Sequence, residues 1–439
     1  MYEVIGNWNR NYKLCDIKSI SEKTNLCIMG WVNDISFNND KIKLELRDGT
    51  GIEYFVILKD NIREPIYKKL QDMTIESVIG LKGVLNPEKI NKLDIDEVKI
   101  FNRAHEPFPV NDLDIGDTGL LPRRGLVIRN PRIRTILKVN AEIRKSTRNF
   151  LENQGFVEFS SNVLGIATDP GVRTANLFTL PSYSKTPYVL SSSAQLYKQA
   201  ALSALDRAFT IFPALRAEPK DSIVTGRHLS EFTELDVEMA FATREDILSL
   251  GEHLLCFVLE SVKESCKKEL DNLNVEIHIP KIPFTKITHE EAVKMATQEG
   301  IKTDIENEIS WEAEVFISKR FNEPFWIVDY PVKSRAWYYR QDIGNPCIAK
   351  TFDLIYPNGY GEGITGGERE YDYDTLMRRM EERGDEPKKY LWYTEMFKYG
   401  MPPSVGFGLG IERLVRYISK SKYIWETTLF PKVPNILSP

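Results

Sequence analysis

The sequence is poor in cysteine and has no long apolar run. Its five cysteines are scattered along 439 residues, and no two of them are spaced as Cys-x-x-Cys. This excludes a disulfide framework and gives no pattern of zinc ligands. The longest strongly apolar run, Leu254–Leu259, is far shorter than the ~20 residues that cross a bilayer. Because the first residues also lack the pattern of a secretion signal, we expect a cytoplasmic protein with no membrane-spanning segment.

Neither sign of charge is in large excess. The 58 Lys and Arg residues stand against 63 Asp and Glu residues, which gives a net charge of -5, and 42% of the residues are hydrophobic. This composition excludes a disordered or fibrous chain. It also argues against nonspecific binding of nucleic acid, while allowing one basic face for a particular RNA. The length of 439 residues predicts two or three domains.

The first hundred residues predict a small β-barrel. Between residues 24 and 102, short apolar runs alternate with turn sequences such as Asp48-Gly49-Thr50-Gly51. Prolines and glycines then concentrate between Glu106 and Pro131, as in a hinge. We therefore divide the chain into a barrel domain (1–104), a linker (105–130) and a larger domain (131–439).

The larger domain shows both helical and strand patterns. Asn130 and Pro131 predict the start of an amphipathic helix that Gly155 ends, and Thr243 with Asp246 predicts the capping box of a second helix. Strand-like stretches without a regular βαβ rhythm lie at residues 188–190, 208–212, 232–241, 325–328, 352–356 and 404–407. The expected fold class is α+β, with a mixed or antiparallel sheet flanked by helices.

A first group of candidate functional residues lies in a predicted hairpin between residues 212 and 238. Arg216 could contact a phosphate with two N–H groups, and His228 could meet another phosphate. Phe232 offers a ring on which a base can stack, and Glu218 can accept a hydrogen bond from an exocyclic amine. The alternative is a solvated hairpin with a surface network of ion pairs.

A second group lies in a glycine-rich segment that contains Asp353 and Glu362. We expect these two carboxylates on adjoining turns, where they can hold Mg²⁺ against a polyphosphate. The spacing Gly361-x-Gly363-x-x-Gly366 imitates a dinucleotide fingerprint. No βαβ unit accompanies it, so we discount a dinucleotide site.

A third group is the run from Gly406 to Arg413, which predicts a glycine-rich strand that leads directly into a helix. Such a strand lets the backbone pack closely under a nucleotide, while Arg413 reaches its terminal phosphate. A structural glycine strand is the alternative. Joined with Arg216 and Glu362, Arg413 would complete an ATP site.

In this order, the three segments resemble the class II aminoacyl-tRNA synthetases, specifically the aspartyl/asparaginyl branch of archaeal type. Arg216-Ala-Glu218 with Arg227-His228 and Phe232 looks like the second motif of the family, and Gly406 to Arg413 looks like the third. The helix that ends at Gly155 is similar to the first motif, which builds the dimer interface. The resemblance covers essentially the whole chain. It implies an N-terminal OB-fold that binds the anticodon, a class II synthetase catalytic domain and a homodimer.

The same resemblance implies the reaction. With ATP and Mg²⁺ the enzyme would activate an amino acid as an aminoacyl adenylate and transfer it to tRNA. Arg216 and Arg413 would be the catalytic residues, on the α-phosphate and the γ-phosphate. The implied ATP-binding residues are Arg216, Glu218, His228, Phe232, Glu362, Gly408, Gly410 and Arg413, and the implied metal ligands are Asp353 and Glu362.

The amino acid is either aspartate or asparagine, which are almost isosteric and must be distinguished by hydrogen-bonding groups. The segment Gln195-Leu-Tyr-Lys198-Gln199 is similar to the aspartyl enzymes, whereas asparaginyl enzymes carry Glu at the position of Gln199. By this resemblance Lys198 and Arg369 would clamp the side-chain carboxylate, Asp236 would take the α-ammonium, and Gln195 would complete the amino-acid site. We therefore expect aspartate, with the tRNA for Asp or Asn as partner.

The barrel departs from the family where the anticodon is read. Lys43 stands at the position of a phenylalanine that stacks on the middle anticodon base, and Tyr54 replaces a second typical reader. A lysine cannot stack as an aromatic ring does. Anticodon reading by the usual residues is therefore not supported, although Tyr54 or Phe37 could take over the stacking.

Three alternatives stay open at this point. One is an asparaginyl-tRNA synthetase proper. The second is asparagine synthesis from aspartyl adenylate and ammonia, because the Thr-Gly-Arg-His loop and the Gly-Gly-Glu-Arg-Glu-Tyr stretch look like those of archaeal relatives that catalyse it. Those relatives lack the barrel, which this chain keeps. The third is a non-catalytic RNA-binding paralogue, against which the intact Arg216, Glu362 and Arg413 argue.

Overall fold

The computed structural model describes residues 3–87, 91–109, 115–171, 177–181 and 187–439. The chain divides into two compact units, Met1–Leu113 and Asp114–Pro439. Within the predicted linker, the described residues form two short helices, η3 (Thr118–Arg123) and α2 (Arg124–Val127). The domain limits at residues 104 and 130 stay predictions.

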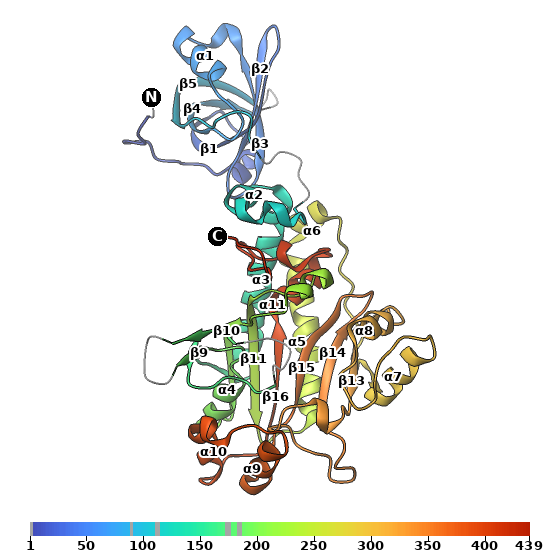
Figure 1. Cartoon of the computed structure of the whole chain (residues 1–439). Helices are drawn as coiled ribbons and strands as arrows, with labels where there is room; N and C mark the ends of the chain where they lie inside the picture. The colour runs from blue at the N-terminus through green and yellow to red at the C-terminus, as the bar shows by residue number, and fades with distance from the viewer. Residues whose placement is uncertain (1–2, 88–90, 110–114, 172–176, 182–186) are drawn as a thin grey trace. The chain divides into compact units, whose positions relative to one another are not determined.

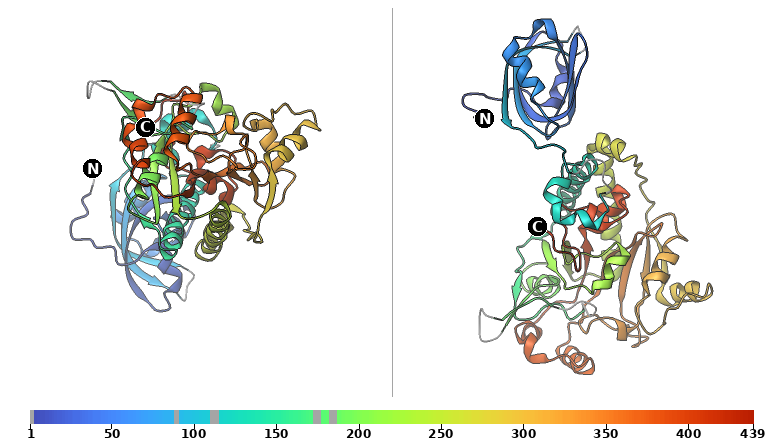
Figure 2. Two further views of the ribbon diagram at one scale, coloured as in Figure 1. Left: turned by 90° about the horizontal axis from the view of Figure 1, so that it is seen from below. Right: turned by 45° about the horizontal axis from the view of Figure 1, so that its top comes forward.

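The smaller unit is a closed barrel with the strand order β1-β2-β3-β5-β4, drawn in blue in Figures 1 and 2. Residues at alternate positions of β2, namely Ile42, Leu44 and Leu46, are fully buried and fill the barrel. The predicted five-stranded barrel is therefore confirmed, and five strands are the number in an OB-fold. Its elements are η1 (Leu14–Ser19), β1 (Thr24–Phe37), β2 (Lys41–Arg47), β3 (Ile52–Leu58), η2 (Lys59–Asn61), α1 (Glu64–Gln71), β4 (Val78–Asn86) and β5 (Lys92–Asn102).

The larger unit is built on an eight-stranded sheet with the order β12-β13-β14-β15-β16-β11-β10-β6. Its strands are antiparallel except for the outermost pair at each edge, so the predicted mixed sheet is confirmed. The strands are β6 (Val157–Glu158), β10 (Arg207–Leu215), β11 (Glu231–Ala240), β12 (Thr285–Thr288), β13 (Phe325–Val328), β14 (Thr351–Tyr356), β15 (Gly361–Glu368) and β16 (Ser404–Gly410). A small second sheet has the order β7-β9-β8, from β7 (Leu164–Gly165), β8 (Thr179–Leu180) and β9 (Tyr188–Leu190).

Two long helices, α3 (Pro131–Asn153) and α5 (Arg244–Ser265), lie side by side against the sheet (Figures 1 and 2). Both predicted caps are confirmed. The side chain of Asn130 accepts from the backbone N–H of Arg132, and Thr243 forms a capping box with Asp246. Apolar residues of both helices and of the central strands form one continuous core.

Shorter helices cover the edges and ends of the sheet (Figure 1). They are α4 (Gln195–Ala201), η4 (Lys220–Thr225), α6 (Lys267–Leu273), α7 (His289–Thr297), α8 (Trp311–Ser318), η5 (Val332–Ser334), α9 (Tyr373–Glu382), η6 (Pro387–Tyr390), α10 (Leu391–Phe397), α11 (Ile411–Ser419) and η7 (Ile424–Glu426).

The glycine-rich segment around Glu362 corrects one prediction. Asp353 and Glu362 lie within the paired antiparallel strands β14 and β15, and not on adjoining turns. Aromatic side chains of β14 explain the glycines, because a Cβ atom at Gly363 would collide with the ring of Tyr356. At Gly363 the neighbouring ring needs the space, whereas Gly359 and Gly361 have positive φ angles of 84° and 79°, which favour glycine for the backbone itself.

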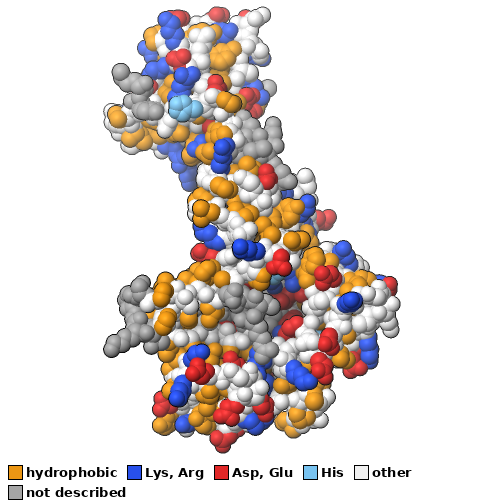
Figure 3. All heavy atoms as spheres, viewed as in Figure 1, with side chains coloured by type: hydrophobic (Ala, Val, Ile, Leu, Met, Phe, Trp, Pro, Cys, Tyr) orange, Lys and Arg blue, Asp and Glu red, His pale blue; other side chains and the backbone are white. Residues whose placement is uncertain are grey.

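The surface matches the near balance of charge in the sequence. On the face drawn in Figure 3, acidic and basic side chains are interspersed over the larger unit. In the described parts of both units, no helix has the length and apolar character needed to cross a membrane.

Candidate active site

Three carboxylates stand on the same face of β11. Glu234, Asp236 and Glu238 occupy alternate positions, and side chains two residues apart in a strand point to the same side. Their exposed fractions are 9%, 1% and 0%. Because a buried carboxylate needs a charge partner or strong donors, each of them requires a cation nearby.

Each carboxylate forms an ion pair with a cationic side chain from a different element of the fold. We call the three carboxylates and their three cationic partners the ion-pair ladder. Its cations come from the residue after β10, from α4 and from the residue after β15. The pairs are Glu234–Arg216, Asp236–Lys198 and Glu238–Arg369, with N–O distances of 3.3, 2.6 and 2.9 Å. The fold therefore brings together four predicted site residues that lie far apart in the sequence, namely Lys198, Arg216, Asp236 and Arg369.

The glycines of β16 make room for the ladder. In the pairing of β11 with β16, Glu238 lies opposite Gly406, Asp236 opposite Gly408 and Glu234 opposite Gly410. A Cβ atom at Gly406 would collide with Glu238, and one at Gly408 would lie 3.2 Å from Glu234 Oε1. These contacts give the glycines a structural reason, and the nucleotide contact of Gly408 and Gly410 stays a prediction.

Arg216 and Arg413 face the same site. Burial raises the pKa of Glu218 above its ordinary value, while Arg216 and Arg413 both act to lower it. Both guanidinium groups are therefore near enough to influence this one carboxyl. Arg413, in the first turn of α11, donates to the side chain of Glu362 at 2.9 Å, and the ring of Phe232 lies 4.8 Å from the Arg216 guanidinium carbon. The predicted ATP-binding side chains therefore converge.

His228 belongs to the same group but carries no charge near neutral pH. Burial, together with the nearby Arg413 and Arg227, lowers the pKa of His228 to about 3. Its Nδ1 lies 2.8 Å from the hydroxyl of Thr225. A neutral imidazole can hydrogen-bond to a phosphate but adds no charge to the site.

Arg227 is held by Glu314, a residue that the sequence analysis did not single out. Glu314 lies on α8 and forms an ion pair with the Arg227 guanidinium. It also accepts a hydrogen bond from the backbone N–H of Glu362 at 3.0 Å. Glu314 thus connects the hairpin loop to β15.

Asp353 and Glu362 lie close enough to influence each other. Burial raises the pKa of Asp353, Arg335 opposes this and Glu362 adds to it. Arg335, also missed from the sequence, binds both oxygens of Asp353 at 3.2 and 2.7 Å and lies over the ring of Tyr330. Burial raises the pKa of Glu362 as well, but Arg413 and Arg227 bring it below its ordinary value, so this carboxylate is ionised.

These two carboxylates fit the donor chemistry of Mg²⁺, which binds through one or two carboxylates together with phosphate oxygens. Across the described ranges, no group of three or more His, Cys, Asp or Glu side chains is placed to hold a metal ion. A cation at Glu362 would therefore take most of its ligands from a phosphate substrate and from water. Both oxygens of Asp353 already accept from Arg335, so Glu362 is the more open of the two predicted ligands.

The other end of the ladder presents N–H donors. Lys198 uses two of its three N–H donors within the protein, on Asp236 and on the carbonyl of Phe407, and its predicted contact with the substrate stays a prediction. Three buried nitrogens have no hydrogen-bond partner among the residues that the structure describes, namely Gln195 Nε2, Gln199 Nε2 and Arg369 Nη1. The hydroxyl of Tyr393 on α10 donates to Gln199 Oε1 at 2.5 Å and so determines which end of the amide stays open. Burial raises the pKa of Tyr393, Arg369 opposes this and Glu238 adds to it.

Glu314, Arg335 and Tyr393 share the reason why the sequence did not reveal them. Each acts through a partner on another element, and Tyr393 is 194 positions from Gln199. None lies in a motif or a periodic pattern that would mark it. Only the folded chain shows what these residues contact.

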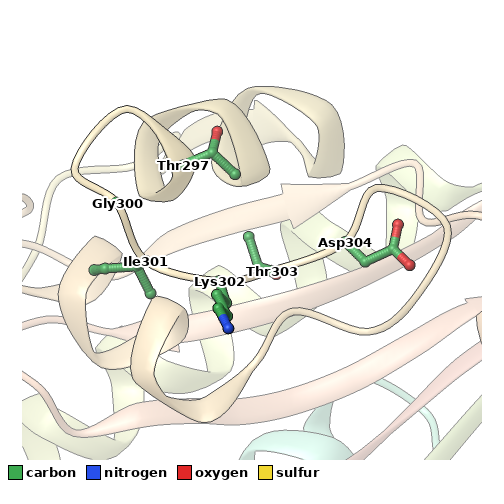
Figure 4. A pocket seen from close by; sticks show the side chains of 6 residues that line it. All are labelled: Thr297, Gly300, Ile301, Lys302, Thr303 and Asp304. Atoms are coloured by element: carbon green, nitrogen blue, oxygen red, sulfur yellow. The ribbon is translucent and has the colours of Figure 1, made fainter.

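A surface hollow beside α7 is not part of this site. It is lined by Thr297, Gly300, Ile301, Lys302, Thr303 and Asp304. Figure 4 shows the side chains of Ile301, Lys302 and Asp304 pointing in different directions. Because binding sites need converging polar groups, this hollow has no arrangement for a ligand.

Comparison with known proteins agrees with this geometry. Residues 119–434 match the family described as tRNA synthetases class II (D, K and N). The chain is 34% identical to the aspartate–tRNA(Asp/Asn) ligase of Methanocaldococcus jannaschii, over 98% of this chain and 99% of that protein. It is 32% identical to the asparagine–tRNA ligase of Pyrococcus abyssi, over 97% and 98%. The structure also matches the crystal structure of asparaginyl-tRNA synthetase from Pyrococcus horikoshii complexed with asparaginyl-adenylate, with a TM-score of 0.88, 31% identity and coverage of 95% and 97%.

Proposed function

The chain belongs to the class II tRNA synthetases and is an ATP-dependent aminoacyl-tRNA ligase of the aspartate/asparagine type, and we propose that it activates aspartate. The relatives include enzymes named for both amino acids, so the choice rests on the chemistry of the site.

The observation that carries the proposal is the run of open N–H donors beside Arg369. Gln195 Nε2, Gln199 Nε2 and Arg369 Nη1 are buried donors without a partner in the described chain. A carboxylate has only acceptors and can satisfy them all, whereas an asparagine side chain brings an NH₂ group that needs an acceptor. The nearby acceptors are occupied, because Arg369 takes both oxygens of Glu238 and Tyr393 takes Oε1 of Gln199.

The opposite end of the ladder supports adenylate formation. We place the α-phosphate of ATP at Arg216, the γ-phosphate at Arg413 and the adenine on Phe232, with Glu218 and His228 as further contacts. The amino-acid carboxylate attacks the α-phosphorus in line, so that a new O–P bond forms while the bond to the pyrophosphate breaks. Catalysis then comes from positioning and from fixed positive charge, without a covalent nucleophile. In the second step a ribose hydroxyl of tRNA attacks the activated carbonyl carbon, and AMP leaves.

Mg²⁺ belongs to this proposal, with Glu362 and Asp353 as its protein ligands. When bound, the ion would neutralise charge on the phosphates. The protein itself orients Glu362 through Arg413 and through the backbone contact with Glu314.

A homodimer is also proposed. β6 is the last strand of the large sheet, and in the described chain it pairs with β10 alone. Val157 on β6 is an exposed apolar side chain, and so are Ile166 and, in the small second sheet, Leu164 and Leu180. Burying such side chains against a second copy would remove them from water. Light scattering measures the mass directly, and a monomer at micromolar concentration would contradict this part of the proposal.

The amino-acid assignment is tested by ATP–pyrophosphate exchange with aspartate and with asparagine. We expect the wild type to favour aspartate by about two orders of magnitude or more, because a mismatched amide leaves buried groups unpaired. Gln199→Glu replaces an open donor by an acceptor and should lower exchange with aspartate while raising exchange with asparagine. Gln154→Glu makes the same change at an exposed residue and should alter neither. A wild type that favours asparagine would overturn the assignment.

A further inference from the structure

Glu234 has a buried oxygen without a donor. Its Oε1 accepts from Arg216 at 3.3 Å, while its Oε2 has no hydrogen-bond partner among the described residues. The residue is only 9% exposed. Buried acceptors are nearly always paired, so an unpaired one calls for an explanation, and a missing ligand is a direct one.

The position of this oxygen identifies the group that it would meet. The carboxylate that reacts must lie beside the α-phosphate, and therefore beside Arg216. In an α-amino acid the ammonium is attached to the carbon next to that carboxylate. Among the three ladder carboxylates, Glu234 is the one paired with Arg216, and so the ammonium would be placed against it.

From this geometry we infer that Glu234 accepts the α-ammonium of the amino acid through Oε2. The inference rests on the proposed function and refines it, because Asp236 was expected in this role. Both oxygens of Asp236 are already engaged, Oδ1 by Lys198 at 2.6 Å and Oδ2 by the backbone N–H of Ala194 at 3.1 Å. Asp236 instead holds Lys198 in place, and Glu234 supplies the open acceptor.

The surroundings of Glu234 also predict how the KM for the amino acid changes with pH. Burial raises the pKa of Glu234 to about 8, with Asp236 on the same strand and Asp169 acting in the same sense. Arg216 and Lys198 act to lower it. The carboxyl is therefore mostly protonated at neutral pH in the free enzyme, and binding an ammonium favours loss of this proton. By linkage, the KM for the amino acid should fall as the pH rises from 6 to 8, by at most about ten-fold per pH unit.

The decisive experiment compares Glu234→Gln with Glu231→Gln in pyrophosphate exchange. Glu231 lies on the same strand and is exposed, so it controls for the chemical change. We expect Glu234→Gln to raise the KM for aspartate by about ten- to a hundred-fold, to leave the KM for ATP within about three-fold and to remove most of the pH dependence. Glu231→Gln should change none of these.

Succinate separates loss of the ammonium contact from general damage. It keeps both carboxylates of aspartate but has no ammonium, so its inhibition constant should be the same in the wild type and in Glu234→Gln. Asp236→Asn, which releases Lys198, should weaken the binding of aspartate and of succinate to the same extent. The inference is overturned if Glu234→Gln leaves the KM for aspartate unchanged, or if it weakens the binding of succinate as much as the binding of aspartate.

Failure of this inference differs from failure of the proposed function. Aspartate and asparagine share the same α-ammonium, so a wild type that prefers asparagine would refute the amino-acid assignment and leave the Glu234 test to be run with asparagine. The pH dependence of the wild-type KM needs no variant at all. A flat KM between pH 6 and 8 would contradict the inference even if Glu234→Gln does not fold.

Discussion

The ion-pair ladder in the larger unit and the charged group on β2 and β3 of the barrel contain the same kinds of charged side chain. The ladder is buried, whereas the group on the barrel is exposed to solvent. Lys198 is 1% exposed and lies 2.6 Å from Asp236. Lys43 on the barrel is 47% exposed, lies 3.5 Å from Glu45 and rests near the ring of Tyr54. In a low dielectric each buried charge requires its partner, whereas an exposed pair is screened and exchanges partners readily.

This difference separates two ways of recognising a ligand. The ladder presents a few buried atoms of defined direction, which suits discrimination between two nearly isosteric amino acids. The barrel presents an exposed positive charge beside an aromatic ring, which suits a polyanion such as tRNA. Four changes test the comparison, from the largest expected effect to the smallest.

Glu238→Gln should be the most damaging. It leaves the Arg369 guanidinium, which is 1% exposed, without its counter-charge. We expect a loss of about 3–5 kcal/mol in the free energy of unfolding, measured by urea denaturation. Glu45→Gln on the barrel should cost no more than about 1 kcal/mol. Equal losses in the two variants would mean that burial does not set the strength of these pairs.

Arg216→Ala should slow the activation of the amino acid by ATP. Removing a guanidinium from the α-phosphate should reduce pyrophosphate exchange by about 10²–10³-fold, as expected for the loss of one donor at a developing charge. Arg207→Ala, at the other end of β10, removes an exposed arginine that donates to a backbone carbonyl and should leave exchange unchanged. Similar rates for the two variants would show that Arg216 does not contact the phosphate.

Stability should fall as the pH drops from about 6.5 to 4, in part through His289. Burial lowers the pKa of His289 to about 4, so the unfolded chain takes up a proton in this range that the folded chain does not. The penalty reaches about 2 kcal/mol at pH 5. His289→Gln should flatten the dependence of the urea midpoint on pH, while the exposed His253→Gln should not. An unchanged slope in His289→Gln would exclude this residue as the source.

Lys43→Ala should have the smallest effect on folding, below about 1 kcal/mol. If the barrel binds tRNA through this face, the variant should also weaken the salt dependence of tRNA binding. The slope of the logarithm of the binding constant against the logarithm of the salt concentration should become about one unit less steep. Lys18→Ala removes another exposed lysine of the barrel and serves as the control. Identical salt dependence in the two variants would argue against tRNA contact at Lys43.

The structure agrees with the sequence most closely where the determinants are local. Asn130 and Thr243 start their helices because each cap joins a side chain to the backbone within three residues. Short apolar runs between turn sequences predicted the barrel, and strand geometry alone directs Ile42, Leu44 and Leu46 of one such run to one face. The strand positions of Asp353 and Glu362 were misassigned to turns, because the ring that requires Gly363 belongs to another strand.

By itself, the sequence determined the succession of barrel, long helices and mixed sheet, and it identified the charged residues of the three motifs. Only the tertiary structure decided which atoms of those residues stay open. It pairs Arg335 with Asp353, orients the amide of Gln199 by a hydrogen bond from the hydroxyl of Tyr393, and leaves one oxygen of Glu234 without a donor among the described residues. The physical reason is that a hydrogen bond occupies an atom and not a residue, and most of these bonds join elements that meet only when the sheet has formed.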